Sequence, residues 1–300
     1  MTVEIAQSRS DLDPRREVCP VCGGRELRLH DVDLRGHRLE RCGGCGVAFL
    51  NPTYSDAYLA RYYTGYIALH PEDAAQVPAQ GNGRVPWRAR PDVRREGKRR
   101  LFALAQRLGA TGRALAVGCG DGLELEVGRE LGFAMTGYDV DPALTAQLAA
   151  RLGVPVHGGE FARLPLPDAS FDLVLMDQVL EHLKEPMPYL HTVRRLLRPG
   201  GILLLAVPNV GSLANRWKTL EGRLRLRPRK RGKHYNTKHH VLFFTPRALR
   251  AAVAAAGGFE VLELRGSLKP QEHPLTGWLG RFSPLFDSGM LLVARRTATR

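Results

Sequence analysis

Four of the five cysteines stand in two pairs near the beginning of the sequence, and their spacing is that of a metal site. Cys19 and Cys22 belong to CPVCGG, Cys42 and Cys45 belong to CGGCG, and the full pattern is C-x2-C-x19-C-x2-C. A tight turn with glycine after the second cysteine can aim two thiolates at one ion, and two such turns complete a tetrahedral set of sulfurs that suits Zn²⁺. Disulfides are the alternative, which a cytoplasmic location would disfavour. We predict a structural zinc site, because four thiolates leave no coordination position open for catalysis.

A cluster of glycines surrounds the fifth cysteine, Cys119. The segment RALAVGCGDG starts at residue 113 and has glycine at three alternating positions, Gly118, Gly120 and Gly122. Such a cluster marks a backbone that turns sharply or lets a ligand come close, so a nucleotide site, a reactive thiol and a simple tight turn are all candidates. The dinucleotide pattern G-x-G-x-x-G would require glycine where Leu123 stands. Asp139 ends the next predicted strand, where a carboxylate can accept two hydrogen bonds from a ribose diol.

The segments that must position these residues predict a ribbon followed by an α/β sheet. Between the cysteine pairs, RELRLHDVDLRGHRLERC alternates like two short strands around an Arg-Gly turn, which is typical of a zinc ribbon. The tyrosine-rich residues 51–66 predict a short helix that packs back on the chain. From residue 92 an amphipathic helix precedes alternating strands and helices, which predict a doubly wound, mostly parallel sheet. The last two strands, FEVLELRG and MLLVARR, have no clear helix between them and should pair antiparallel.

Composition sets the limits of the whole chain. With 300 residues and 44% hydrophobic content the chain can bury a full-sized core. The longest apolar run, GILLLAV, is too short to span a membrane, and the first residues lack the apolar core of a signal peptide, so we expect a cytoplasmic protein. The proline-rich stretch 71–91 reads as a linker or a mobile cover. We divide the chain into a ribbon domain at 1–52, a linker or cover at 53–97 and a main domain at 98–300, with separate cores for ribbon and main domain.

From about residue 98 to its end, the chain resembles the class I S-adenosylmethionine-dependent methyltransferases. The motifs that carry the resemblance are LAVGCGDG, GYDVD, LPLPDASFDLVLMDQVLEHL, LLRPGGILLLAVPN and HHVLFFTPRALRAAVAAAGGF. The N-terminal part, with CGVAFLNP followed by paired tyrosines, is similar to the cysteine-rich module that precedes such domains in many bacterial methyltransferases. The resemblance implies a Rossmann-like methyltransferase fold at 98–300 and S-adenosylmethionine as cofactor. One position departs from the pattern, since the family usually has Asp or Glu where this chain has Ala116.

The resemblance also implies a cofactor site. The positions that match the family's motifs are Gly118, Gly120, Gly122, Asp139, Val140, Glu160, Phe161, Asp177 and Gln178. The glycines would line the methionine and ribose part, and Asp139 would hold the ribose hydroxyls. Val140 would pack on adenine, Glu160 would bond its amino group and Phe161 would lie beside the ring. The last two positions would border the methionine end and the methyl acceptor. Cys119 is then a small apolar filler without redox chemistry.

Two histidines are candidates for catalysis. Methyl transfer from a sulfonium is an in-line displacement, so the enzyme aligns a nucleophile behind the methyl group and, for a hydroxyl acceptor, removes a proton. Histidine suits this task at neutral pH. His182, in LEHL, follows the predicted fourth strand, and His240 lies with His239 in the basic connection after the fifth strand, where the family often builds its acceptor pocket. A structural role is the alternative for each.

The acceptor must be inferred from charge. The chain carries a net charge of +14, and residues 221–240, EGRLRLRPRKRGKHYNTKHH, form a dense basic block. The block suits a nucleotide-sugar diphosphate, a lipid-linked phosphate or RNA, or else it is a solvated loop. We predict a small, phosphorylated or related acceptor, with a sugar or metabolite hydroxyl as the methylated group. The alternative is an rRNA or tRNA methyltransferase that binds RNA through the ribbon and the block, although the block has few aromatics for stacking. A third possibility is a non-enzymatic binding protein with a degenerate methyltransferase domain, which only Ala116 supports.

Overall fold

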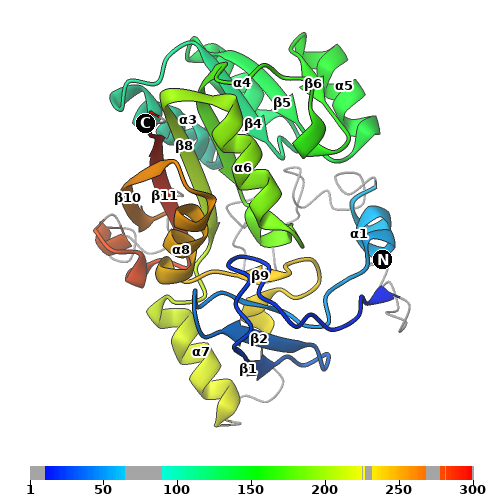
Figure 1. Cartoon of the computed structure of the whole chain (residues 1–300). Coiled ribbons are helices and arrows are strands. Elements are labelled where there is room, and N and C mark those ends of the chain that lie inside the picture. The colour runs from blue at the N-terminus through cyan, green and yellow to red at the C-terminus, as the bar shows by residue number, and fades with distance from the viewer. Residues whose placement is uncertain are drawn as a thin grey trace.

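The protein folds around two β-sheets that lie side by side in space. The structure, a computed structural model, describes residues 11–64, 90–224, 226, 232–267, 278–280 and 282–298. Within these residues one sheet has four strands in the order β1-β2-β3-β9, and the other has seven in the order β10-β11-β8-β7-β4-β5-β6. Figure 1 shows the small sheet at the lower end of the molecule, with the large sheet above it. Most of the linker predicted at 53–97 falls in residues 65–89, which lie outside the described part.

The small sheet contains the predicted ribbon and extends it. Its strands are all antiparallel to their neighbours: β1 (Leu27–Val32), β2 (Arg38–Cys42), β3 (Ala48–Leu50) and β9 (Leu242–Phe243). The hairpin of β1 and β2 around the Arg-Gly turn agrees with the sequence-based expectation, and Gly36 supplies the positive φ of +81° that this turn needs. The third and fourth strands were not predicted. Because β9 comes from far along the chain, the ribbon is tied to the segment that carries His239 and His240.

The large sheet confirms the doubly wound fold with antiparallel last strands. Its strands are β4 (Arg113–Val117), β5 (Ala134–Tyr138), β6 (Val156–His157), β7 (Phe171–Asp177), β8 (Leu197–Pro208), β10 (Phe259–Gly266) and β11 (Gly289–Arg296). The strands β4 to β8 run parallel, while β11 pairs antiparallel with both β8 and β10. After its first residue β4 is completely buried, because helices cover both faces of the sheet. The carboxyl ends of the parallel strands therefore share one edge.

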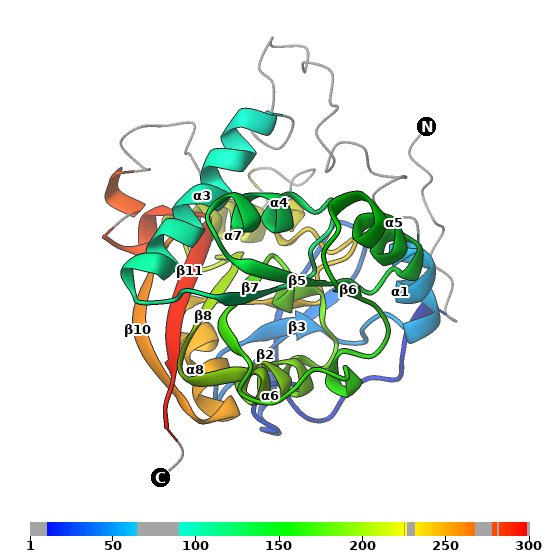
Figure 2. The ribbon, with the colours of Figure 1, turned by 90° about the horizontal axis from the view of Figure 1, so that it is seen from above.

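Helices cover the large sheet on both sides. The helices are α1 (Asp56–Tyr63), α3 (Pro91–Arg107), α4 (Leu123–Glu130), α5 (Pro142–Leu152), α6 (Pro186–Leu196), α7 (Leu213–Arg223) and α8 (Pro246–Ala256). Figure 2 shows the large sheet between α3, α4 and α5 on one side and α6 and α8 on the other. Four of these helices begin at a proline, whose fixed φ suits the first turn. Among the described helices, none is both long enough and apolar enough to cross a bilayer.

One apolar cluster joins the ribbon to the large sheet. It includes Val47 and Phe49 of the ribbon, Leu203 and Leu205 of β8 and Phe244 after β9, all of them buried. A second cluster fills the layer between the sheet and helices α3 and α4. The expectation of separate cores for ribbon and main domain is therefore wrong, because the face of the sheet opposite α3 and α4 continues into the ribbon. The domain limits at 52 and 97 stay a prediction.

Candidate active site and zinc site

A cavity of about 700 Å³ lies at the carboxyl ends of β4, β5 and β7. This volume is in the range of cofactor and ligand sites. Six of the predicted functional residues line its wall, and they are Gly118, Gly120, Asp139, Val140, Gln178 and His182. Helix α1 closes the cavity from the side, with Tyr63 in its wall. The topology thus brings residues from four separate segments to the edge where doubly wound sheets bind ligands.

The glycine loop is folded against the end of β5. The backbone N–H groups of Gly118 and Cys119 donate to the carbonyl of Tyr138 at 2.8 and 3.0 Å. Gly118 has a φ of +69°, and a Cβ atom at this position would lie 2.6 Å from Cγ2 of Val179. A side chain is therefore excluded here on two grounds. Cys119 is buried, and burial raises the pKa of its thiol far above the ordinary value, which agrees with its role as an apolar filler.

The carboxylate of Asp139 connects the loop to the cavity. Its Oδ2 atom accepts the N–H of Gly120 at 2.9 Å, and its Oδ1 atom accepts the N–H of Asp141 at 3.3 Å. Burial raises the pKa of Asp139, while these backbone N–H groups act in the opposite direction. The side chain of Val140 is 51% exposed beside it, an apolar surface that a bound ring would cover. Both residues thus line the cavity, and their roles at a ribose and at a base stay predictions.

Asp139→Ala is expected to weaken S-adenosylmethionine binding by about 1–3 kcal/mol, because charge-assisted hydrogen bonds to the ribose are lost. Asp139→Asn should lose less, since its amide oxygen still accepts the N–H of Gly120. Calorimetry of both variants, with the exposed Asp168→Asn as control, would measure the change. Tight NAD binding by the wild-type protein, or an unchanged affinity in Asp139→Ala, would contradict the assignment.

Four predicted cofactor residues lie outside the cavity wall, and three of them are Gly122, Phe161 and Glu160. Gly122 caps α4 with a φ of +85°, and a Cβ atom there would lie 2.7 Å from Cδ2 of Leu148 on α5, so this glycine allows helix packing. Phe161 is fully buried and stacks on Tyr189 at 4.8 Å between ring centroids. Glu160 is exposed and pairs with Arg163. Their roles toward the cofactor stay predictions, because Gly122 and Phe161 also have packing roles.

The fourth predicted residue outside the wall is Asp177, which lies in a buried charged cluster. Its Oδ2 atom accepts a hydrogen bond from Nζ of Lys98 at 2.8 Å, and Lys98 also pairs with Glu124. Burial alone would lower the pKa of Lys98, but the two carboxylates raise it well above its ordinary value. The next residue, Gln178, does line the cavity and has a φ of +62°, a conformation that non-glycine residues rarely adopt. Asp177 thus belongs to the charged cluster, whereas the adjacent Gln178 belongs to the cavity wall.

Histidines and tyrosines gather at the end of the cavity that α1 closes. The rings of His182, His239 and His240 lie 4.6 to 5.1 Å apart between centroids. Nδ1 of His182 is hydrogen-bonded to the Tyr63 hydroxyl at 2.9 Å, and Nδ1 of His239 to the Tyr62 hydroxyl at 2.8 Å. His182 lines the cavity, whereas His240 lies behind it. The sequence predicted that the tyrosine-rich helix packs on the chain, but the pattern of tyrosines alone does not identify the histidines as its partners.

The four cysteines of the ribbon converge on one point. All four Sγ atoms lie within 4.8 Å of one another, and the pairs Cys19–Cys45 and Cys22–Cys42 are 3.5 Å apart. A tetrahedral Zn²⁺ site with Zn–S bonds of about 2.3 Å requires sulfur atoms about 3.8 Å apart. The thiol of Cys45 lowers the pKa of Cys19 to about 5, so the cluster also favours a thiolate. The residues fit a zinc ribbon, in which these four side chains would hold the ion and stabilise the fold.

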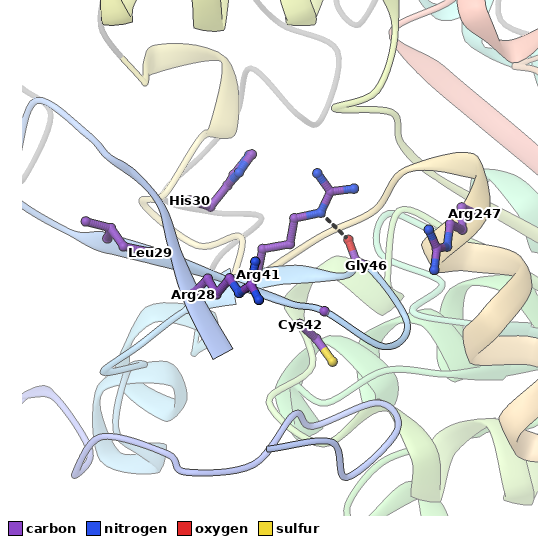
Figure 3. A pocket seen from close by; sticks show the side chains of 8 residues that line it. Arg28, Leu29, His30, Arg41, Cys42, Gly46 and Arg247 are labelled. Carbon is purple, nitrogen blue, oxygen red and sulfur yellow. Dashed lines mark hydrogen bonds between the residues drawn. The ribbon is translucent and has the colours of Figure 1, made fainter. Parts of the chain in front are cut away.

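Three arginines line a pocket next to Cys42, one member of this cysteine cluster. Figure 3 shows Arg28, Arg41 and Arg247 around a pocket that also contains Cys42. Arg41 donates from Nε to the carbonyl of Gly46 at 3.2 Å, and Arg247 donates to the carbonyl of Gly44 at the same distance. Zn²⁺ with four thiolates carries a formal charge of −2, which these guanidinium groups would offset. The turn between β2 and β3 is thus held by Arg41 from β2 and by Arg247 from the distant helix α8.

The doubly wound sheet, the glycine loop after β4 and the acid after β5 are together typical of Rossmann-like domains that bind a nucleotide cofactor. Residues 88–264 match the family model described as a methyltransferase domain. A probable S-adenosylmethionine-dependent methyltransferase of Mycolicibacterium smegmatis is 40% identical over 96 residues, which are 32% of this chain and 37% of that protein. A ubiquinone biosynthesis O-methyltransferase of Caulobacter vibrioides is 31% identical over 194 residues, 60% of this chain and 71% of that protein. The chain therefore belongs to the methyltransferase-domain family.

A solved structure supports the same fold. The 1,6-didemethyltoxoflavin-N1-methyltransferase of Burkholderia thailandensis, with 1,6-didemethyltoxoflavin and S-adenosylhomocysteine bound, is similar with a TM-score of 0.53 and 19% identity. The similarity covers 90% of this chain and 100% of that one. At this identity it shows the fold alone. The first relative, in contrast, is matched over much less than half of its length. A degenerate, non-enzymatic methyltransferase domain would match the same family model, so a transfer assay has to test the alternative that Ala116 raises.

Proposed function

We propose that the enzyme transfers the methyl group of S-adenosylmethionine to a hydroxyl group of a small molecule, a sugar, a nucleotide-linked compound or a related metabolite. The observation that carries this proposal is the cavity of about 700 Å³, which extends from the glycine loop to the histidines and is covered by α1. A cavity closed in this way suits a compact acceptor placed against the methyl group. The relatives named above as O- and N1-methyltransferases are, by their names, enzymes of small-molecule biosynthesis.

At the acceptor end we assign the activation of the hydroxyl group to His182 and His240. His182 lines the cavity. The ring of His240 packs edge-on against the ring of His182, with 4.8 Å between the centroids. The ring of His182 is held at Nδ1 by the Tyr63 hydroxyl at 2.9 Å and by the carbonyl of His239 at 3.3 Å. Activation makes the acceptor oxygen a better nucleophile. The S–CH₃ bond then breaks as the O–CH₃ bond forms, and the electron pair stays on sulfur in S-adenosylhomocysteine.

The basic block gives the alternative, RNA methylation, its strongest support. Of its cations Arg223 lies in the described part, where it donates to the carbonyl of His30 at 2.9 Å and so reaches the ribbon. Lys238 is also described and has an exposed side chain, whereas for Lys233 the structure describes the backbone only. The other cations of the block lie outside the described residues, and they are Arg225, Arg227, Arg229, Lys230 and Arg231. A block next to both ribbon and cavity suits a phosphate on a small acceptor as well as an RNA backbone.

The dependence of binding on salt separates the two acceptors. Each phosphate contact contributes about one unit to the slope of log affinity against log salt, so RNA bound by the whole block would give a slope steeper than about four. We expect a shallow slope and RNA binding that disappears near physiological salt. Removing charges at Arg223, Arg225 and Arg227 should raise KM for a phosphorylated small acceptor.

The acceptor itself can be found with labelled S-adenosylmethionine. The protein would be incubated with a metabolite extract and, in parallel, with total RNA, and the label followed by mass spectrometry. We expect label in a small molecule that resists base-catalysed ester cleavage, as an ether does. Label in RNA, together with a steep salt slope, would contradict the small-molecule acceptor and favour RNA methylation.

A further inference from the structure

The histidine cluster at the acceptor end has the composition of a second metal site. One ring nitrogen from each of His182, His239 and His240 lies within 4.8 Å of the others, and each side chain is partly buried. His182 comes from the turn after β7, while the other two precede β9. Imidazole nitrogen suits divalent transition metals such as Zn²⁺. Three such ligands leave one position open, as in catalytic zinc sites.

The hydrogen bonds of two of these rings place the lone pair on Nε2. Nδ1 of His182 lies 2.9 Å from the Tyr63 hydroxyl and 3.3 Å from the carbonyl oxygen of His239. Because the carbonyl can only accept and the hydroxyl can accept as well, a proton on Nδ1 satisfies both contacts and leaves the lone pair on Nε2. The amide nitrogen of Asn236 donates to Nε2 of His239 at 3.0 Å, so there too Nδ1 carries the proton, which it donates to the Tyr62 hydroxyl. Metal-binding histidines characteristically use one nitrogen for the metal and donate the other N–H to an oxygen. In this site a metal ion would replace the Asn236 donor.

A buried carboxyl group lies beside the ring of His182. Oε1 of Glu181 lies 3.9 Å from Nε2 of His182, and the Glu181 side chain is 1% exposed. The three neutral imidazoles contribute no charge of their own, so a nearby carboxylate would stabilise a dication. The segment that carries His239 and His240 is held in place by the N–H of Val241, which donates to the carbonyl of Glu181 at 2.8 Å. The segment with His182 and the segment with His239 and His240 are therefore hydrogen-bonded to each other.

We propose that His182, His239 and His240 bind a divalent transition metal ion, with Zn²⁺ as the first candidate, at the acceptor end of the cavity. Tetrahedral Zn–N bonds of about 2.0–2.1 Å require nitrogens about 3.4 Å apart, which modest rotation of the partly buried rings provides. Only the role of the metal ion rests on the proposed function. In that role the open coordination position binds the acceptor hydroxyl group and lowers the pKa of this group. The hydroxyl proton passes to solvent water, and the metal-stabilised oxygen displaces the sulfonium. The histidines then act as ligands, in place of the proton acceptor suggested by the sequence.

Metal stoichiometry tests the site without any acceptor. Tag-free protein saturated with Zn²⁺ should contain two equivalents, one in the ribbon and one in the histidine cluster. His182→Ala and His240→Gln should each lose one equivalent and keep the ribbon zinc, whereas His191→Ala, at an exposed histidine, should keep both. Tyr63→Phe removes a group that holds a proposed ligand and should weaken the second site about 10–100-fold.

Cobalt distinguishes the two sites by their ligands. After exchange with Co²⁺, the ribbon should show intense thiolate charge transfer in the near ultraviolet, and the histidine site only weaker visible bands, which His182→Ala removes. A single equivalent in the wild-type protein, or two equivalents in both His182→Ala and His240→Gln, would overturn the proposal. The wild-type stoichiometry decides the matter even if one variant fails to fold. Because no acceptor is present, a failed acceptor assignment leaves this result unaffected.

Discussion

Cys42→Ser is expected to release the ribbon zinc and to abolish methyl transfer while leaving cofactor binding largely intact. Structural Zn²⁺ contributes about 10–16 kcal/mol in small zinc domains, which equals or exceeds the whole stability of a typical domain. The small sheet should therefore unfold. The strand β3 pairs with β9, and the N–H of Leu50 donates to the carbonyl of Val241 at 3.0 Å, so unfolding of the ribbon displaces the adjacent His240. Because the ribbon shares one apolar cluster with the large sheet, the large sheet also loses stability. The glycine loop and Asp139 keep their contacts, since these join the loop to the end of β5 and include no residue of the ribbon.

The measurement has two parts. Metal analysis should show the loss of one equivalent, the one with thiolate charge transfer after Co²⁺ exchange, and calorimetry should still detect S-adenosylhomocysteine binding. Cys119→Ser is the matched control, because this cysteine lies in the glycine loop, outside the ribbon cluster. Retention of all zinc in Cys42→Ser, or an iron–sulfur absorption band in the wild-type protein, would contradict the zinc assignment. Full transfer activity with the ribbon unfolded would show that the two parts are independent.

Local patterns were sufficient to predict most of the elements. The apolar strand predicted before the glycines is β4, and Pro142 begins α5 as expected. The segment FEVLELRG forms β10 and pairs antiparallel with the last strand, β11. These elements depend on hydrophobic periodicity, turn residues and helix starts that a few neighbouring residues decide. The cysteine spacing likewise depends on local turns. The corresponding predictions, of a doubly wound sheet and a four-cysteine cluster, are confirmed.

Elements that depend on distant partners could not be predicted in the same way. The strand β9 has only two residues, Leu242 and Phe243, and forms because β3 offers it an edge. Helix α7 lies in a basic connection in which charge masks the apolar positions. The contacts Tyr62–His239 and Tyr63–His182 join residues more than a hundred positions apart. In each case the stabilising contact comes from tertiary packing, which overrides or supplements weak local propensity.

The candidate site shows the same division. The glycines and Asp139 follow directly from the ends of β4 and β5, and the structure brings them to one cavity. The motif predicts Phe161 beside the cofactor, and the structure shows it buried and stacked on Tyr189, which lines the cavity. Motif position thus identifies the segment, whereas the choice between two neighbouring aromatic rings depends on how the segment packs.

His182→Ala is expected to reduce kcat about 10²–10⁴-fold, the usual contribution of the group that activates a reacting hydroxyl. KM for S-adenosylmethionine should stay unchanged, because the residues predicted to bind the donor, the glycine loop and Asp139, belong to other segments of the cavity wall than His182. A fall in kcat with a constant donor KM is the sign of an interaction made mainly in the transition state. Steady-state kinetics with the acceptor found by labelling would measure both constants.

The control for this variant is Tyr63→Phe, which keeps the ring of Tyr63 against His182 and removes only the hydroxyl that bonds Nδ1 at 2.9 Å. We expect an intermediate fall in kcat, since the histidine remains but its orientation is less well fixed. His191→Ala, on an exposed face, should have wild-type constants. If His182→Ala instead raised KM for the donor and left kcat intact, the ring would have a packing role at the cofactor. His182 would then lose its place in the activation of the acceptor, and the histidine next to β9 would have to act without it.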